Sequence, residues 1–178
     1  MTTARIALTC CAFLLLLAPA LAEKRRDPLT DPEVDQLRDT AMEPDLRLKL
    51  YVTFARARLT ALEQSRSDPK TPDRAAATHD GLQDFLDVYD ELDENVDTFV
   101  GRKADLRKVL KVVIDADTEF QAKLRALLDD ATARKEEMQQ YQFLLSNAIE
   151  TLDASTQDHR QLLTEQEEAA KQKKKTKP

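Results

Sequence analysis

The stretch GLQDFLDVYDELDENVDTFV, residues 81–100, decides the fold because its apolar side chains recur at alternating steps of three and four. These side chains are Leu82, Phe85, Tyr89, Leu92, Val96 and Phe99. The spacing places all six on one face of an α-helix, and it is typical of helices packed at a shallow angle in bundles and coiled coils. We therefore predict a long helix over residues 72–100 with one buried face.

The same spacing recurs on both sides of this stretch. Upstream, residues 44–66 carry Leu48, Tyr51, Ala55, Leu59 and Leu62 at helical intervals. Downstream, one series comprises Leu106, Leu110, Val113, Phe120, Leu124 and Leu127. A last series comprises Met138, Tyr141, Leu145, Ala148, Leu152, Ser155, His159 and Leu162. A short helix comes first, opened by Thr30 or Asp31 as its cap with Pro32 in its first turn.

These elements predict an all-α fold, an elongated antiparallel helical bundle of about four long helices preceded by a short one. We assign residues 31–170 to this single domain, 23–30 to a charged flexible leader and 171–178 to a basic flexible tail. Only two glycines, Gly81 and Gly101, occur in the chain, which disfavours strand-rich folds because their turns depend on glycine.

The apolar register continues across Gly101, which leaves two interpretations of residues 100–106. One bent helix runs through the glycine, or two helices meet in a tight hairpin, with residues 101–105 as the turn. Glycine favours a helix end or a bend, and Asp105 offers a cap for the next helix. We favour the hairpin.

The N-terminal stretch indicates export. Its apolar run from Ile6 to Ala18 is 13 residues long, shorter than the roughly 20 that a transmembrane helix needs. Arg5 precedes the run and an A-x-A site ends at Ala22, as in a cleaved signal peptide. Lipid attachment fits poorly because Cys10 and Cys11 lie inside the apolar run, and the three basic residues 24–26 after the site disfavour translocation. We predict a signal peptide over residues 1–22, cleaved between Ala22 and Glu23, and a periplasmic or secreted protein.

Cleavage changes the composition of the chain. The remaining 156 residues contain no cysteine, so the fold must be held by burial and helix packing instead of disulfides. Loss of Arg5 leaves 26 Lys and Arg against 33 Asp and Glu, a net charge of −7. This acidic balance excludes a general nucleic-acid binder.

His159 and Asp117 are the weak candidates for a metal or small-ligand site, because each is a polar residue on an apolar stripe. A carboxylate-bridged di-metal bundle requires a Glu three residues before a His on two helices, whereas position 156 is Thr and position 76 is Ala. We therefore expect His159 to complete a buried polar layer that fixes the helix register. His79, beside Asp80, is expected at the surface.

The sequence offers no motif for catalysis. No cysteine remains after cleavage, and neither a G-x-S-x-G turn nor a glycine-rich phosphate loop occurs. Acidic pairs are too numerous for any one to stand out. We expect no catalytic residue, no bound cofactor and no enzymatic activity.

Two basic features remain. The helix at 44–66 carries Arg47, Lys49, Arg56 and Arg58, but its apolar stripe is expected to be covered by the other helices. The C-terminal lysines suit a helix end, and they allow at most weak peripheral contact with anionic surfaces. They are Lys171, Lys173, Lys174, Lys175 and Lys177.

The expected function is that of an exported, non-enzymatic interaction or structural protein that binds a protein partner, or itself, through its helix faces. The alternatives are a metal- or small-ligand-binding bundle lined by His159 and Asp117, or a periplasmic holdase-type chaperone. Envelope helical chaperones share only this architecture, which does not imply a shared function.

We predict that the exported protein begins at Glu23 and dissolves without detergent. Intact-mass measurement of exported material tests this directly. A species that retains residues 1–22, or one that carries the mass of a lipid, contradicts the prediction.

Overall fold

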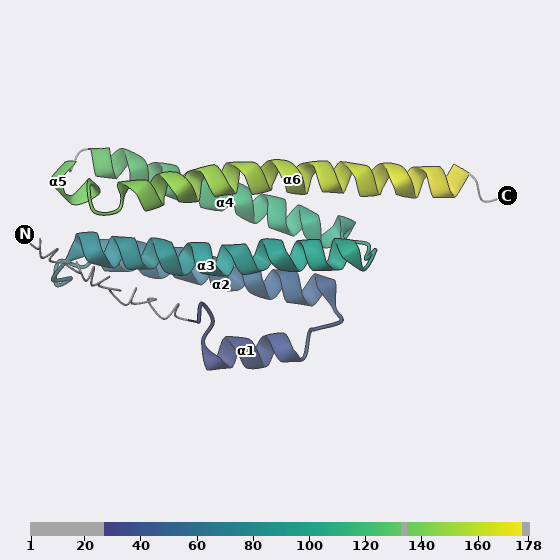
Figure 1. Cartoon of the computed structure of the whole chain (residues 1–178), viewed down its shortest axis with the longest axis horizontal. Coiled ribbons are helices and arrows are strands. Elements are labelled where there is room, and N and C mark those ends of the chain that lie inside the picture. Colours follow the sequence, from purple (N-terminus) through teal and green to yellow (C-terminus); the bar gives the residue numbers. More distant parts are fainter. Residues whose placement is uncertain (1–26, 133–134, 176–178) are drawn as a thin grey trace, which may run out of the picture.

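The computed structural model describes residues 27–132 and 135–175, and their fold is all-helical (Figure 1). The helices are α1 (Asp31–Arg38), α2 (Pro44–Ser67), α3 (Arg74–Gly101), α4 (Arg107–Thr132), α5 (Lys135–Met138) and α6 (Gln142–Lys175). The predicted all-α class is confirmed. No helix in this described part is long and apolar enough to cross a membrane. The predicted signal peptide and Lys177 lie outside the described residues.

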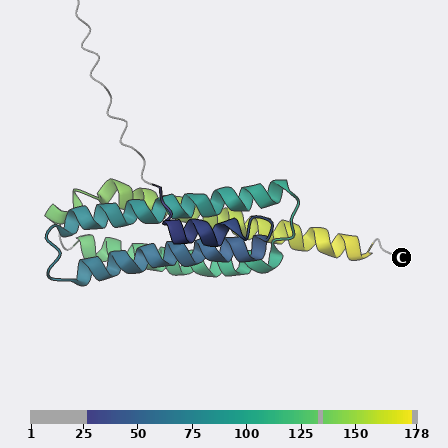
Figure 2. The ribbon, with the colours of Figure 1, turned by 90° about the horizontal axis from the view of Figure 1, so that it is seen from below.

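The four long helices lie side by side, and each one packs on two of the others. Helix α2 packs against α3 and α4, and α6 packs against α4 and α3. Consecutive long helices run in opposite directions along the molecule (Figure 1). The short helix α1 lies against the outside of α2, over the line where α2 and α3 meet (Figure 2).

The apolar stripes read from the sequence form the core between these helices. All six stripe residues of 81–100 are buried, and so are the five upstream ones. The stripe that begins at Leu106, just before α4, and continues along α4 to Leu124 is buried, and Leu127 is half-buried. The rings of Phe85, Tyr89 and Phe120 meet at centroid distances of 5.5–6.4 Å and join α3 to α4 across the centre of the bundle. Burial of these faces is the main stabilising contribution to the fold.

The structure has a hairpin at Gly101, as favoured, and not one bent helix. Helix α3 ends at Gly101, and Lys103 follows in the left-handed region with φ 58°. The Gln166 side chain of α6 then binds both sides of the turn: Nε2 donates to the Ala104 carbonyl at 3.2 Å, and Oε1 accepts from the Leu106 N–H at 2.8 Å. The turn is therefore fixed from a distant helix, and the left-handed residue is a lysine instead of the glycine.

Helix α1 is attached to α2 by two arginines. Thr30 caps α1 in a capping box with Glu33. The Arg58 guanidinium donates to both Glu33 oxygens at 2.6 and 2.9 Å, and Arg47 donates to the Leu37 carbonyl at the other end of α1. Burial disfavours the Glu33 charge, but the hydrogen bonds from Arg58 and Thr30 outweigh it and lower the pKa of Glu33.

Three helix ends differ from the sequence prediction. Helix α3 begins at Arg74, two residues after the predicted start at 72, because Asp73 caps it by accepting from the Ala76 N–H at 2.9 Å. The last predicted helix is divided, because Met138 ends the short α5 and Tyr141 precedes α6. Helix α6 continues through the lysines to Lys175, five residues into the segment for which the sequence predicts a flexible tail. A run of lysines is a good helix former, and cations near a helix C-terminus stabilise it.

Replacement of Leu92 by Ala is expected to lower the free energy of unfolding by about 2–5 kcal/mol, because Leu92 is fully buried on α3. Thermal or urea unfolding followed by far-ultraviolet circular dichroism measures the loss. The control is Leu46→Ala on α2, since Leu46 is 48% exposed. A midpoint that Leu92→Ala leaves unmoved contradicts this packing.

Candidate functional site

The two candidate residues, His159 and Asp117, meet inside the bundle. His159 lies on α6 and Asp117 on α4, and their side chains are 5% and 0% exposed. Nδ1 of His159 is 2.9 Å from Oδ2 of Asp117. The pair joins α4 to α6 near the middle of both helices, where the sequence placed each residue on an apolar stripe.

Three residues that sequence reasoning did not assign to a site complete this cluster. The Tyr89 hydroxyl of α3 donates to Oδ1 of Asp117 at 2.8 Å. Asp93, one helical turn after Tyr89, places Oδ1 3.3 Å from Nε2 of His159 in an ion pair. The Ser155 hydroxyl, one turn before His159 on α6, donates to the other Asp93 oxygen. The sequence feature that could have identified them is the i,i+4 spacing of Tyr89 and Asp93, and of Ser155 and His159, because residues four apart lie on the same face of a helix. We call these five residues the polar cluster.

The polar cluster favours a charged His159. Burial disfavours the imidazolium, but the hydrogen bond to Asp117 and the negative charges of Asp117 and Asp93 outweigh it, raising the pKa of His159 from 6.5 to about 9. Burial and the same two carboxylates raise the pKa of Tyr89 far above its ordinary value, so its hydroxyl stays protonated and serves as a donor. His159 and Asp117 therefore form a buried ion pair at neutral pH.

The geometry of the polar cluster suits a structural role better than chemistry. Both imidazole nitrogens of His159 face carboxylates, so a protonated ring presents no lone pair to a metal ion. The Ser155 hydroxyl is bound to Asp93 and not to an imidazole that would activate it. In the described ranges 27–132 and 135–175, no group of three or more His, Cys, Asp or Glu side chains is arranged to hold a metal. His79 lies at the surface, 3.4 Å from Asp80.

A surface groove of about 490 Å³ opens between α2 and α4, toward the end where α2 passes into α3. We call it the α2–α4 groove. Leucines line it: Leu59 and Leu62 from α2, and Leu124 and Leu127 from α4. Charged side chains surround them: Glu63, Arg66, Arg74, Lys123 and Asp130. The exposed Ala126 on α4 also lines the groove, so a larger side chain there would occupy it.

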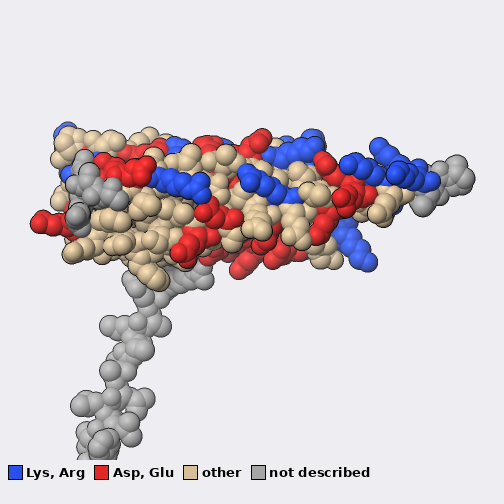
Figure 3. Space-filling model, turned by 90° about the horizontal axis from the view of Figure 1, so that it is seen from above, with Lys and Arg blue, Asp and Glu red and all other residues tan. Residues whose placement is uncertain are grey.

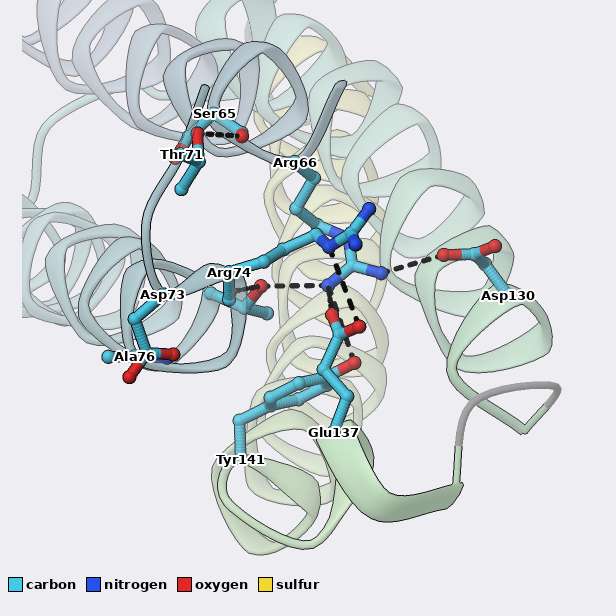
Figure 4. Close-up of polar contacts among 10 residues, drawn as sticks. Ser65, Arg66, Thr71, Asp73, Arg74, Ala76, Asp130, Glu137 and Tyr141 are labelled. Atoms are coloured by element: carbon cyan, nitrogen blue, oxygen red, sulfur yellow. Dashed lines mark hydrogen bonds and ion pairs between the residues drawn. The ribbon is translucent and has the colours of Figure 1, made fainter. Parts of the chain in front are cut away.

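Arg66 holds this end of the bundle together (Figure 4). Its guanidinium donates to Asp130 of α4 at 2.6 Å and to Glu137 of α5 at 2.9 Å, and it also reaches the hydroxyls of Thr78 and Tyr141. Arg74 of α3 adds a second contact to Glu137 at 3.5 Å. One α2 side chain thus fixes four other segments, which makes the groove beside it a preformed surface.

The raised pKa of His159 predicts a pH-dependent stability. A group whose pKa is higher in the folded state stabilises the fold fully below its unfolded value, near pH 6.5, and loses this contribution as the pH rises through about 9. We expect this loss to be about 3 kcal/mol between about pH 6 and pH 10, and to be absent in His159→Gln. Urea unfolding across this pH range measures it.

His79→Gln is the matched control, because His79 is exposed and should leave the pH profile unchanged. Equal pH profiles for the wild-type protein and His159→Gln contradict the buried ion pair.

Comparison with known proteins assigns no role to the polar cluster or to the α2–α4 groove. No protein-family model, no curated protein and no solved structure matches the chain. The roles of the polar cluster and of the α2–α4 groove therefore follow from their geometry.

Proposed function

We propose that the protein is an exported, non-enzymatic interaction protein, an elongated antiparallel helical bundle that binds a protein partner through its helix faces. The α2–α4 groove is the observation that carries the proposal. Its floor consists of leucines, of which Leu127 is half-buried and Leu59, Leu62 and Leu124 belong to the core. Its rim carries both charge signs, so the groove has the composition expected of a surface that receives apolar side chains from a partner.

The charges of the rim favour an uncharged anchor in the groove. Arg66 is committed to Asp130 and Glu137, and Lys123 lies 2.7 Å from Glu63. An anionic ligand would have to compete with these ion pairs, whereas the apolar floor has no such competitor. We therefore assign the groove to one or two apolar side chains of a partner helix or extended segment, with the ion pairs around them excluding water.

The polar cluster supports a scaffold in place of an enzyme or a metal protein. Its hydrogen bonds and ion pairs are made within the protein, and they join α3, α4 and α6 at one position along the bundle. Export remains an expectation from the opening stretch, and a periplasmic or secreted location gives such a scaffold extracytoplasmic partners.

Site-specific crosslinking in the native host tests the proposal. A photoactivatable residue at Glu63, on the rim, is expected to give a discrete adduct with one partner. Ala126→Arg places a long charged side chain over the leucine floor and is expected to lower the adduct yield by about tenfold or more. Ala154→Arg, at another exposed alanine on α6 outside the groove, is the matched control and should leave the yield unchanged.

The pattern of adducts separates the alternatives. A holdase would give many adducts of different mass, because unfolded clients are diverse. An adduct that both arginine variants leave unchanged, or the absence of any adduct at Glu63, contradicts a partner in the α2–α4 groove.

A further inference from the structure

The end of the bundle opposite the α2–α4 groove gathers three segments that are distant in sequence. They are the α1–α2 connection at residues 39–43, the α3–α4 turn at 102–106 and the last turns of α6 (Figure 1). The bond network of Gln166 ties α6 to the α3–α4 turn. Arg102 ties that turn to the α1–α2 connection, since its guanidinium donates to the Ala41 carbonyl at 3.3 Å. The three segments therefore form one surface.

Helix α6 projects beyond the other helices at this end (Figures 1 and 3). The projecting part follows Gln166, and its basic side chains are Lys171, Lys173, Lys174 and Lys175. All four are exposed. They are presented by a helix anchored at Gln166, so their positions relative to the turn are fixed by the fold.

The α3–α4 turn and the start of α4 add further cations to the same end. They are Arg102, Lys103, Arg107, Lys108 and Lys111. Arg107 is paired with Asp105, Lys108 lies 3.6 Å from Asp45, and Lys111 lies 3.3 Å from Glu167. Even with these pairs and the nearby Asp39, Glu43, Asp97 and Glu168, cations outnumber acidic side chains here, although the whole chain carries a net charge of −6.

Exposed apolar side chains accompany the cations. Met42 is 80% exposed in the α1–α2 connection, Leu46 is 48% exposed in the first turn of α2, and Val100 is 37% exposed at the end of α3. Arg102 lies beside Met42, with its guanidinium 4.0 Å from the Met42 sulfur. Cations interleaved with exposed apolar side chains are the pattern of a surface that lies in the interface of an anionic membrane.

We infer that this end of the bundle docks on an anionic lipid surface. The lysines of α6 and the cations of the α3–α4 turn contact the headgroups, and Met42 and Leu46 enter the boundary with the acyl chains. A water-soluble polyanion would satisfy the cations but would leave these apolar side chains in water, so the observations favour lipid. The inference is independent of the α2–α4 groove, which lies toward the other end and would face away from the membrane.

Vesicle sedimentation tests the electrostatic part. The exported protein is mixed with vesicles of phosphatidylcholine alone, or of phosphatidylcholine and phosphatidylglycerol in equal parts, and only the second is expected to bind it. Lys174→Glu/Lys175→Glu should weaken binding by at least about 25-fold, since each cation near such a surface contributes about fivefold. Lys70→Glu/Arg160→Glu changes the net charge equally, away from this end, and should stay within about twofold of the wild-type protein.

A second pair of variants tests the apolar part. Met42→Gln keeps the net charge and should weaken binding to the phosphatidylglycerol vesicles by about tenfold. Phe143→Gln is the matched control, because Phe143 is 86% exposed at the opposite end of the molecule. All four variants alter exposed positions, and unchanged thermal midpoints verify that the fold is intact.

Three results overturn the inference. The first is equal binding to both kinds of vesicle, or to neither. The second is equal loss of binding in the two charge variants, which indicates a general effect of net charge. The third is unchanged binding in Met42→Gln together with tight binding of soluble polyphosphate, which indicates a polyanion site without membrane insertion.

Discussion

The buried ion pair between His159 and Asp117 is the constraint on which the arrangement of the long helices depends. Apolar stripes alone would allow one helix to slide along another, because leucine side chains can pack against one another in more than one register. A buried charge does not tolerate it, since a shift by one turn leaves His159 or Asp117 without its partner in a region of low dielectric. Tyr89 extends the same requirement to α3. The ion pair therefore selects one register among several that burial alone would permit.

The two ends of the bundle use charge differently. At the α2–α3 end, Arg66 is nearly buried, and its guanidinium binds Asp130, Glu137 and two hydroxyl groups. Its charge therefore stabilises contacts within the protein. Burial disfavours the guanidinium charge there, but these hydrogen bonds outweigh it and raise the pKa of Arg66. At the other end, Lys171, Lys174 and Lys175 of α6 are exposed on the part of the helix that projects beyond the bundle. Paired charges stabilise a fold, whereas exposed ones remain available to a partner surface.

These features belong to an elongated bundle whose two ends differ. Helix α6 has 34 residues, about 51 Å at 1.5 Å per residue, and it spans the distance between the two ends. The centre is closed by the polar cluster and by the rings of Phe85 and Phe120. The α2–α4 groove and the basic end are therefore the surfaces where the proposed interactions belong, and a rigid core keeps them at a fixed separation.

The sequence by itself determined the helices and their buried faces, because both depend on local periodicity. The steps of three and four identified most of the core, from Leu48 on α2 to Leu152 on α6, but missed flanking residues such as Val52, Leu86 and Val109. His159 and Asp117 were found as polar interruptions of apolar stripes. Helix ends were less well determined. Helix α3 begins at Arg74, behind the cap Asp73, instead of at residue 72, and helix α6 continues to Lys175, because the local alternatives differ by only about 1 kcal/mol.

Only the tertiary structure decided which stripes face one another and what completes each polar site. Asp93 and Ser155 belong to the polar cluster because α3 packs beside α6, a pairing that neither helix encodes in its own periodicity. The close approach of α2 to Gly81 is likewise a tertiary contact, since a Cβ at this position would lie 2.9 Å from Leu62 Cδ1. The hairpin after Gly101 is fixed by Gln166, about 60 residues away. Such contacts depend on the relative position of whole helices, which side-chain fit across the core determines and local spacing does not.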